Sequence, residues 1–359
     1  MRLSVAEQPG AALELMERVL RGGAPLASEY PLVFDEDQKG RFVIAEEAGQ
    51  VSSTCAILER ELVFPGGKLR VGLIGSVSTA EPMRGRGLAS AVLARAEAEL
   101  AAGGCVCSLL WAEDESFYSR RGYREFGSEV DYGLPLELAP LLPKTAGVRR
   151  ANPADFAAMH RLYLNHERRV ERTGEQSALL FAMPGMATWV HECGGALDAY
   201  TCFERGDDLA NTIHEWAGDA DATLACVRGV LEAHGPGTEE GLLFLMAPAP
   251  SGDLGERLET LGAVWARGIL GLGKVLDAEA LLDLLCSRAS LPLTFDGTGP
   301  DVWRIKGPKG EAQVESSQLL GLVCAPRAER TALVGLEEQL GVEFMRLPET
   351  PFLWGLDSI

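Results

Sequence analysis

Long apolar runs are missing from this chain. No stretch of about 18 consecutive apolar residues occurs in it, so we expect no membrane-spanning helix. The N-terminus, MRLSVAEQPG, also lacks the basic start and apolar core of a signal peptide. With 47% hydrophobic and 24% charged residues, the 359-residue chain has the composition of a soluble globular protein. We therefore expect a cytoplasmic protein with no membrane partner.

Paired metal-ligand spacings are absent as well. The eight cysteines are scattered through apolar contexts, and none forms a C-x-x-C pair. Neither H-E-x-x-H nor H-x-x-x-H spacing occurs among the histidines, which are His160, His166, His191, His214 and His234. We therefore expect no metal, ordinary core or surface histidines, and buried, reduced thiols. Cys105 and Cys107 alternate in CVCSLLW, which predicts that both face one side of a strand.

Clustered basic residues are the third absence. The chain has 33 Lys and Arg residues against 52 Asp and Glu residues, a formal net charge of -19. An acidic field repels a polyanion, so we expect no nucleic-acid partner. A cationic or amine-bearing small molecule would be attracted instead. The alternative is that the acidity only keeps the protein soluble.

The N-terminal part of the chain predicts an α/β domain. Three runs rich in β-branched residues, separated by turn signals, favour an antiparallel meander: residues 41–50, 51–64 and 69–80. Apolar residues at three- and four-residue spacings predict a helix over 88–100, which Gly103-Gly104 ends. A buried strand over 105–112 and a short helix within 115–127 follow, and we expect the last strand of the domain to end near Gly133.

The rest of the chain repeats this order of elements without repeating its sequence. Asn152-Pro153 predicts a capped helix start, residues 253–265 predict a helix, and 269–277 predict a final strand. Residues 301–317 predict a hairpin. The predicted divisions are a first domain (1–134), a linker (135–147), a second domain (148–289) and a small C-terminal domain (290–359).

One short turn carries the clearest functional signal. A predicted strand leads into EPMRGRGLAS, and the helix begins at once. Glycines let the backbone approach a ligand closely, and the N–H groups at a helix start attract an anion. The spacing does not match G-x-x-x-x-G-K-[ST], nor G-x-G-x-x-G after a first strand. The turn therefore predicts an anion site other than these nucleotide-binding loops.

This turn resembles the acetyl-CoA turn of the GNAT acetyltransferases, R-x-x-G-x-[GA], over Arg84–Ala89. Further on, SFYSRRGYREFG resembles the family's last-helix signature, F-Y-x-x-x-G-[FY]. The resemblance implies that the residues around acetyl-CoA are Val77, Ser78 and Thr79 along the pantetheine arm, and Arg84, Gly85, Arg86, Gly87, Leu88, Ala89 and Ser90 at the pyrophosphate.

Tyr118 falls on the family tyrosine that protonates the departing thiolate. A phenol with a pKa of about 10 is protonated at neutral pH and can act as this acid. The alternative is that Tyr118 is only a core aromatic residue, as we expect for Tyr123. Glu113 and Asp114, just before this motif, either face the substrate or form a solvated loop.

The proton acceptor is harder to predict. Family members often carry a glutamate on or near the fourth strand, but VGLIGSVSTA contains no carboxylate. The remaining candidates near this region are Glu81, Glu59, Glu61, Asp35 and Glu36.

The order of domains resembles that of the Eis-type aminoglycoside acetyltransferases. That resemblance implies an α/β (α+β) protein with tandem GNAT folds on mixed central sheets, a small α+β sterol-carrier-like domain, and a hexamer as a possible homo-oligomer. In that family the terminal carboxylate is the base, which here is the carboxylate of Ile359. The tail PFLWGLDSI is too apolar for a free end, so we expect it to be buried. The alternative is a tail that only joins domains.

We therefore expect an acetyl-CoA-dependent N-acetyltransferase that moves acetyl directly to a primary amine. The amine would belong to a cationic small molecule, such as an aminoglycoside or a polyamine, or to a lysine side chain. The alternative is a non-catalytic CoA- or lipid-binding protein. Transfer from tRNA is disfavoured by the charge of -19.

Overall fold

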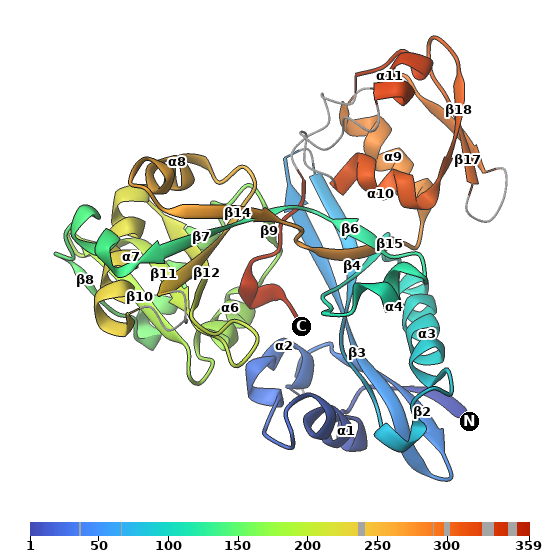
Figure 1. Ribbon diagram of the computed structural model, residues 1–359, viewed down its shortest axis with the longest axis horizontal. Coiled ribbons are helices and arrows are strands. Elements are labelled where there is room, and N and C mark those ends of the chain that lie inside the picture. The colour runs from blue at the N-terminus through green and yellow to red at the C-terminus, as the bar shows by residue number, and fades with distance from the viewer. Residues whose placement is uncertain are drawn as a thin grey trace. The chain divides into compact units, whose positions relative to one another are not determined.

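The computed structural model describes residues 1–35, 37–65, 67–235, 241–289, 291–297, 302–324, 334–343 and 350–359. The chain divides into two units (Figure 1). Unit 1 consists of Met1–Ser128, Ile269–Pro351 and the terminal Ile359, and unit 2 of Glu129–Gly268 and Phe352–Ser358. Each unit is built on a mixed sheet with helices, so the predicted mixed α/β class is confirmed.

The sheet of unit 1 has the strand order β1-β2-β3-β4-β5-β15-β6. Its strands are β1 (Arg2–Ala6), β2 (Arg41–Glu47), β3 (Gln50–Phe64), β4 (Gly67–Thr79), β5 (Cys107–Leu110), β15 (Gly271–Val275) and β6 (Arg124–Phe126). Neighbours in this order are antiparallel except β4 and β5, which are parallel. The predicted meander over residues 41–80 is therefore confirmed as β2, β3 and β4.

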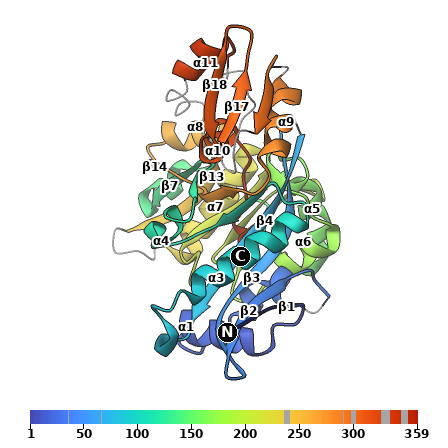
Figure 2. The same ribbon diagram turned by 90° about the vertical axis from the view of Figure 1, so that its right-hand side faces the viewer.

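Helix α3 (Leu88–Ala102) packs against β2, β3 and β4 and follows the predicted periodicity (Figure 2). The predicted apolar face is buried: Leu88, Val92, Leu93, Ala96 and Leu100. The other helices of unit 1 are α1 (Gly10–Leu20), α2 (Pro31–Phe34), α4 (Glu115–Ser119), α9 (Ala278–Ala289), α10 (Ser316–Cys324) and α11 (Val334–Leu340), with one-turn helices η1 (Ala27–Glu29) and η2 (Glu81–Met83).

A small antiparallel sheet lies near the C-terminal end of unit 1. It consists of β16 (Thr294–Gly297), β17 (Val302–Lys306) and β18 (Glu311–Glu315). The predicted hairpin is confirmed as β17 and β18, whereas β16 had no predicted counterpart. Leu320 of α10 packs close to Gly273 of β15, so this part contacts the main sheet of its unit. Its likeness to a sterol-carrier domain stays a prediction.

The sheet of unit 2 has the strand order β14-β7-β13-β12-β11-β10-β8. Its strands are β14 (Val264–Gly268), β7 (Glu129–Pro135), β13 (Leu242–Pro248), β12 (Thr212–Gly218), β11 (Ala196–Phe203), β10 (Ala187–Cys193) and β8 (Val148–Arg150). Only β12 and β13 are parallel neighbours in this order.

The helices of unit 2 are α5 (Phe156–Tyr163), α6 (Gly174–Phe181), α7 (Ala220–His234) and α8 (Gly252–Thr260), with one-turn helices η3 (Leu136–Leu141), η4 (Pro153–Asp155) and η7 (Gly355–Asp357). A two-residue strand, β9 (Arg169–Val170), lies outside the sheet of this unit. The helix start predicted at Asn152-Pro153 is confirmed, because Asn152 caps η4.

Two strands belong to a different sheet from the one we expected. The strand expected to close the first domain is β7, which lies between β13 and β14 of unit 2. The strand predicted over 269–277 is β15, which lies between β5 and β6 of unit 1. Each pairing joins strands that are distant in sequence, so no local pattern reports it. The units therefore divide after Ser128 and Gly268, whereas we predicted domain ends after residues 134 and 289.

Two local predictions were wrong. The helix predicted over 253–265 ends at Thr260, and Val264 and Trp265 belong to β14. Gly262 has a φ of 91°, a left-handed conformation that turns the chain between the helix and the strand. The expectation of buried thiols fails at Cys193, which is exposed at the end of β10. The side chains of Cys286 and Cys324 lie outside the described residues.

Candidate active site

Strand β4 is the centre of the candidate site because it continues beyond its pairing with the shorter strand β5. The described parallel register ends with the pair Leu73 and Leu109, whereas β4 continues to Thr79. Pairing of β4 with β3 continues beyond that point but with an irregularity, where Ser76 has a left-handed φ of 53°. The described pairing with β5 therefore uses no backbone group of β4 beyond Leu73.

The C-terminal residue packs on this irregular part of β4. A Cβ atom built on Gly75 would lie 2.6 Å from both the carboxyl carbon and a carboxyl oxygen of Ile359. Real Cβ atoms do not make such short contacts, so glycine is the residue that leaves room for the terminal carboxyl group. Gly75 and Ile359 both belong to unit 1. The free carboxylate of the chain therefore lies directly against β4.

The glycine turn follows β4 in the predicted place. Gly85 and Gly87 have left-handed φ values of 74° and 78°, and a Cβ on either would meet no atom within 4 Å. The turn is exposed from Arg84 to Gly87. The Arg84 side chain donates to the Thr79 carbonyl at 3.4 Å, which links the turn to the end of β4. The backbone of this turn is thus open to a ligand on its outer side.

The start of α3 has no side-chain cap. Gly87 is the N-cap residue, and the first helical hydrogen bond runs from the Ala91 amide to the Gly87 carbonyl. Leu88 anchors the helix in the core, while Ala89 and Ser90 are partly exposed. The first amides of an α-helix have no partner within the helix, and the helix dipole makes its N-terminus attractive to anions. The start of α3 therefore has the chemistry of a phosphate site.

Tyr118 lies on α4 and packs on the core of unit 1. Its ring makes edge contacts with Phe117 and Tyr123, at centroid distances of 4.9 Å and 5.8 Å. Burial raises the pKa of Tyr118 to about 12, and the nearby Cys55 thiol adds to this effect. The phenol is therefore protonated over the whole physiological pH range. Tyr123 is fully buried, and its hydroxyl bonds with that of Ser108 at 3.0 Å.

Arg121 connects α4 to the first turn of α3. Its guanidinium Nε donates to the Ser90 hydroxyl at 3.2 Å and stacks over the Phe117 ring at 3.6 Å. A hydrogen bond and a cation–π contact together fix α4 against the first turn of α3. Sequence reasoning did not single out Arg121 from SFYSRRGYREFG.

The carboxylates predicted as alternative bases lie in other settings. Glu59 bonds with Arg41 at 2.7 Å and also with Arg70, and its carboxylate lies near Gly103, at the C-terminal end of α3. Glu61 of β3, whose side chain is partly exposed, pairs with Lys68 at 2.6 Å. Of the remaining three, Asp35 and Glu81 are exposed, and Glu36 lies outside the described residues.

The acidic pair before α4 serves the helix itself. Asp114 is the N-cap of α4, and its carboxylate accepts a hydrogen bond from the Ser116 amide at 3.1 Å. The hydrogen bonds from Ser116 lower the pKa of this exposed carboxyl. Asp114 and Glu113 are both exposed, as in the solvated-loop alternative. Among the described residues, no group of histidine, cysteine and carboxylate side chains could hold a metal ion, and no helix has the length and apolarity to cross a bilayer.

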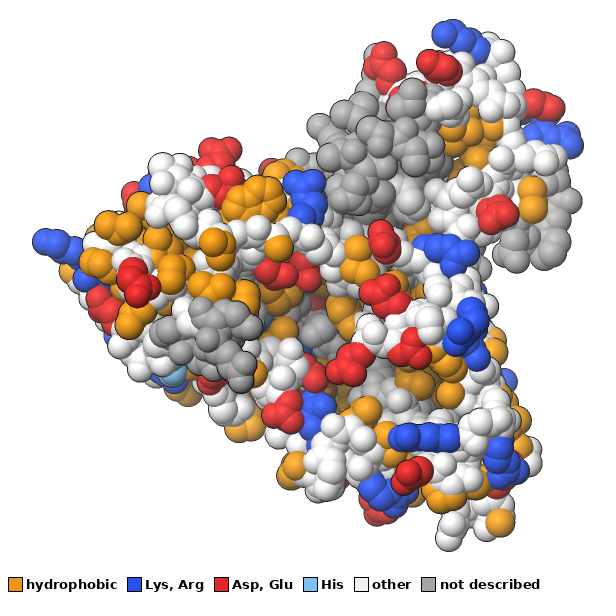
Figure 3. All heavy atoms as spheres, in the orientation of Figure 1, with side chains coloured by type: hydrophobic (Ala, Val, Ile, Leu, Met, Phe, Trp, Pro, Cys, Tyr) orange, Lys and Arg blue, Asp and Glu red, His pale blue; other side chains and the backbone are white. Residues whose placement is uncertain are grey.

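Charged side chains of both signs are spread over the face of the molecule drawn in Figure 3. At the glycine turn, for example, the basic side chain of Arg86 pairs with the acidic side chain of Glu47 at 2.8 Å.

The order of β4, glycine turn, α3, β5 and tyrosine helix can be compared with known protein families. Residues 11–126 match the acetyltransferase (GNAT) domain family. The match covers β4, the turn, α3 and Tyr118, so this part of the chain is similar to a GNAT acetyltransferase domain. Domains of this family use acetyl-CoA. A search of curated proteins finds no match to the chain.

Solved structures extend the similarity of fold to the whole chain. In each case 100% of both chains is covered. They include a conserved protein of unknown function from Enterococcus faecalis V583 (TM-score 0.70, 14% identity), a GCN5-related N-acetyltransferase from Kribbella flavida (0.66, 15%) and Eis1 from Mycobacterium abscessus (0.63, 17%). At these identities the likeness is one of fold.

Gly75 is the site residue that sequence reasoning missed although a signal was present. A glycine inside a strand often marks a close approach of another backbone, and GLIGSVST contains one at this position. The pattern does not say which backbone approaches. The tail residue that does so lies at the other end of the sequence.

Proposed function

We propose that this protein acetylates a primary amine with acetyl-CoA, using Tyr118 as the acid and the terminal carboxylate of Ile359 as the base. The observation that carries the proposal is the packing of the Ile359 carboxyl group on Gly75, in the stretch of β4 beyond its described pairing with β5. It supplies a carboxylate to a strand whose own sequence has none.

The residues of the turn fit the anionic part of acetyl-CoA. Two left-handed glycines, an exposed backbone and an uncapped helix start favour a pyrophosphate at the amides of residues 85–90. Arg84 adds positive charge on the outside of the turn, and Arg86 lies beside it in an ion pair with Glu47. Val77, Ser78 and Thr79 form the end of β4, where an extended pantetheine arm could pair with the strand. Acetyl-CoA supplies the acetyl group as an activated thioester.

The Ile359 carboxylate would accept the proton that the substrate ammonium must lose. Once neutral, the amine nitrogen forms a bond to the acetyl carbon, the carbon–sulfur bond breaks, and the nitrogen gives its second proton to solvent. Ile359 returns the proton that it accepted to solvent. Tyr118 gives its proton to the departing thiolate and regains one from solvent. The products are an N-acetyl amine and CoA with a free thiol, so atoms and charge balance. The raised pKa of Tyr118 keeps the acid protonated before each turnover.

The substrate class we propose is a cationic primary amine, such as an aminoglycoside, a polyamine or a lysine side chain. The net charge of -19 favours the approach of such molecules over anionic ones. We also propose that unit 2 is a second GNAT-like fold, which the shared strand order supports. The compartment and the assembly state stay predictions.

Adding one glycine after Ile359 tests the base directly. The extension keeps every tail side chain but replaces the carboxylate at this point by a neutral amide. Thiol release from acetyl-CoA is measured over a panel of amines for the wild type and the extended chain. We expect kcat to fall at least tenfold, within the range of general-base catalysis. Unchanged turnover in the extended chain would rule out Ile359 as the base. Binding of CoA without thiol release for any amine would favour the non-catalytic alternative.

A further inference from the structure

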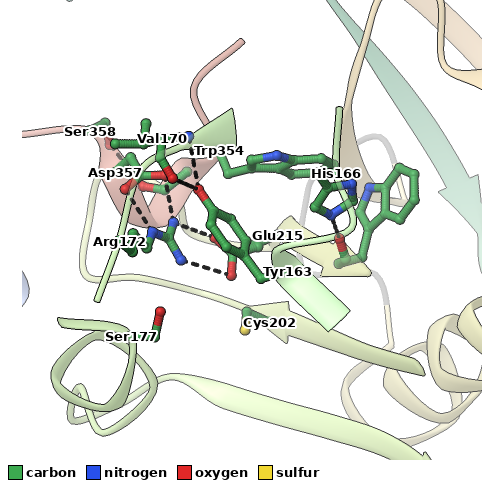
Figure 4. Close-up of polar contacts among 12 residues, drawn as sticks. Tyr163, His166, Val170, Arg172, Ser177, Cys202, Glu215, Trp354, Asp357 and Ser358 are labelled. Atoms are coloured by element: carbon green, nitrogen blue, oxygen red, sulfur yellow. Dashed lines mark hydrogen bonds and ion pairs between the residues drawn. The ribbon is translucent and has the colours of Figure 1, made fainter. Parts of the chain in front are cut away.

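The tail before Ile359 is part of the core of unit 2. Phe352, Leu353, Trp354 and Leu356 are at most 2% exposed. The Trp354 ring lies next to the His166 ring (Figure 4), and the ring centroids are 4.3 Å apart. Apolar packing therefore buries the side chains of the tail as far as Leu356.

A buried ion pair then holds Asp357. Arg172 donates to both oxygens of the Asp357 carboxylate, at 2.7 Å from Nε and 2.6 Å from Nη2 (Figure 4). Both side chains are 0% exposed. The Tyr163 hydroxyl contacts the same carboxylate at 3.0 Å. A two-pronged arginine–carboxylate pair fixes orientation as well as distance.

Arg172 also pairs with Glu215 of β12, so one cation lies between two carboxylates. The closest contact of this second pair is 2.6 Å, from Nη2 to Oε2. The Tyr200 hydroxyl donates to the other Glu215 oxygen at 2.8 Å. Glu215 thus holds Arg172 from the sheet side, while Asp357 holds it from the tail side.

A second buried arginine holds the tail even closer to its end. Arg205 is 3% exposed, and it donates to the Ser358 carbonyl and the Ser358 hydroxyl at 2.9 Å each. It also donates to the Gly355 carbonyl. Gly355 packs so tightly on His214 that an added Cβ would lie 2.6 Å from the His214 Cβ. We call Arg172 and Arg205, with their partners Asp357 and Ser358, the tail anchor.

The place of the tail anchor is informative. Chain ends usually fray, and buried ion pairs are poor stabilisers compared with apolar packing. Here two buried arginines bind Asp357 and Ser358, the last residues before the chain end, although apolar packing already buries the side chains before them. The Cα atoms of Ser358 and Ile359 are about 3.8 Å apart, as in any trans peptide. Fixing the Ser358 carbonyl therefore restricts where the Ile359 carboxylate can lie.

We propose that Arg172 and Arg205 are positioning residues for acetyl transfer, because they hold Asp357 and Ser358 and thereby restrict the position of the Ile359 carboxylate, which is covalently joined to Ser358. This inference rests on the proposed role of that carboxylate as the base. The arginines touch neither substrate nor acetyl-CoA in this scheme. Their contribution is to restrict the position of a group that would otherwise be at a free chain end.

The main test replaces Asp357→Asn, which keeps the size of the side chain and leaves Arg172 paired with Glu215. We expect kcat to fall about 10- to 100-fold, the scale for small misplacements of a catalytic group, while KM for acetyl-CoA stays within about twofold. The acidic limb of the pH–rate profile should move to higher pH. When the carboxylate is misplaced, solvent and not Ile359 must remove the proton from more of the substrate amine. Thermal unfolding verifies that the variant is folded.

A matched pair of milder variants distinguishes an effect on the position of the terminal carboxylate from a general effect on protein stability. Tyr163→Phe and Tyr200→Phe each remove one hydroxyl from this cluster, but only Tyr163 contacts the tail carboxylate. We expect kcat to fall severalfold for Tyr163→Phe and to stay unchanged for Tyr200→Phe. Equal effects of the two variants on kcat would overturn the inference.

The decisive measurement combines Asp357→Asn with the chain extended by one glycine. If Asp357 acts only through the terminal carboxylate, the substitution causes no further loss of kcat in the extended chain. The same fold loss in both backgrounds would show a merely structural role and overturn the inference. An extension that does not lower kcat at all would refute the base itself, and the inference would fail with it. These two failures are therefore distinguishable.

Discussion

Units 1 and 2 share a strand pattern but differ at the start of their central helices. In each sheet four antiparallel strands lead to one parallel pair, which is β4 and β5 in unit 1 and β12 and β13 in unit 2. Helix α3 follows β4, and α7 follows β12. The start of α3 has no side-chain cap, whereas the Asp219 carboxylate caps α7 by accepting from the Ala222 amide at 3.1 Å. A carboxylate at a helix start uses the donors and repels phosphate. The same place in the fold is thus open to an anion in unit 1 and closed in unit 2.

A second difference lies on the central strands. Gly75 lies two residues beyond Leu73, the last residue of β4 in the parallel register, and Glu215 lies two residues beyond Ile213 on β12. The terminal carboxylate packs on Gly75, whereas Glu215 is paired with Arg172. Both positions have a carboxylate, but the one in unit 2 is engaged in the tail anchor. The same position in a shared strand pattern thus receives the proposed base in unit 1 and holds the residues before the chain end in unit 2.

The largest expected effect comes from Tyr118→Phe, which removes the proposed acid from unit 1. We expect kcat to fall about 100-fold or more, the usual scale for a general acid, with acetyl-CoA affinity unchanged. Steady-state kinetics and calorimetric binding measure the two quantities. Tyr123→Phe is the matched control, because its hydroxyl bonds to Ser108 inside the core. Turnover of Tyr118→Phe within threefold of the wild type would contradict the assignment.

Gly75→Ala tests the contact that distinguishes β4 from β12. The new methyl group would lie 2.6 Å from the Ile359 carboxyl carbon, so the carboxylate must move. We expect kcat to fall about 10-fold or more, with the melting temperature less affected. In the chain extended by one glycine the same substitution should have no further effect on kcat. An equal loss in both backgrounds would mean that Gly75 acts through the strand and not through the tail.

Gly87→Asp brings an acidic group like that of unit 2 to the helix start of unit 1. The carboxylate would repel the pyrophosphate, so we expect KM for acetyl-CoA to rise about tenfold at low salt, with kcat at saturation nearly unchanged. Gly87→Asn is the control, because it imposes the same left-handed backbone strain without the charge. If Asp and Asn raise KM equally, strain and not charge explains the change.

Asp219→Ala should have the smallest effect and should be confined to stability. Loss of this N-cap costs about 1 kcal/mol in the free energy of unfolding. Chemical denaturation measures that change, and kcat and KM for acetyl-CoA should remain at wild-type values. A rise in KM for acetyl-CoA would show that the start of α7 also takes part in cofactor binding.

The local features of the fold were predictable because neighbouring residues determine them. The glycine turn, the buried face of α3 and the meander of β2, β3 and β4 depend on spacings within a few residues. The exchange of β7 and β15 between sheets was not predictable. The residues of a strand favour an extended conformation, but they do not determine which sheet edge the strand pairs with in the folded chain. The boundary error at β14 was of a different kind, because the helical pattern was carried past Gly262 into a strand.

The candidate site divides along the same line. The sequence by itself determined the turn at Gly85 and Gly87 and the presence of Tyr118 on a short helix, since these depend on local spacing and on left-handed glycines. Only the tertiary structure decided that Gly75 receives the Ile359 carboxyl group and that Arg172 and Arg205 hold the residues before it. These contacts join residues more than 100 positions apart, and an arginine inside a polar run looks the same in sequence whether it is solvated or buried. Burial and proximity arise only when the chain has folded, and they give these ordinary residues their roles.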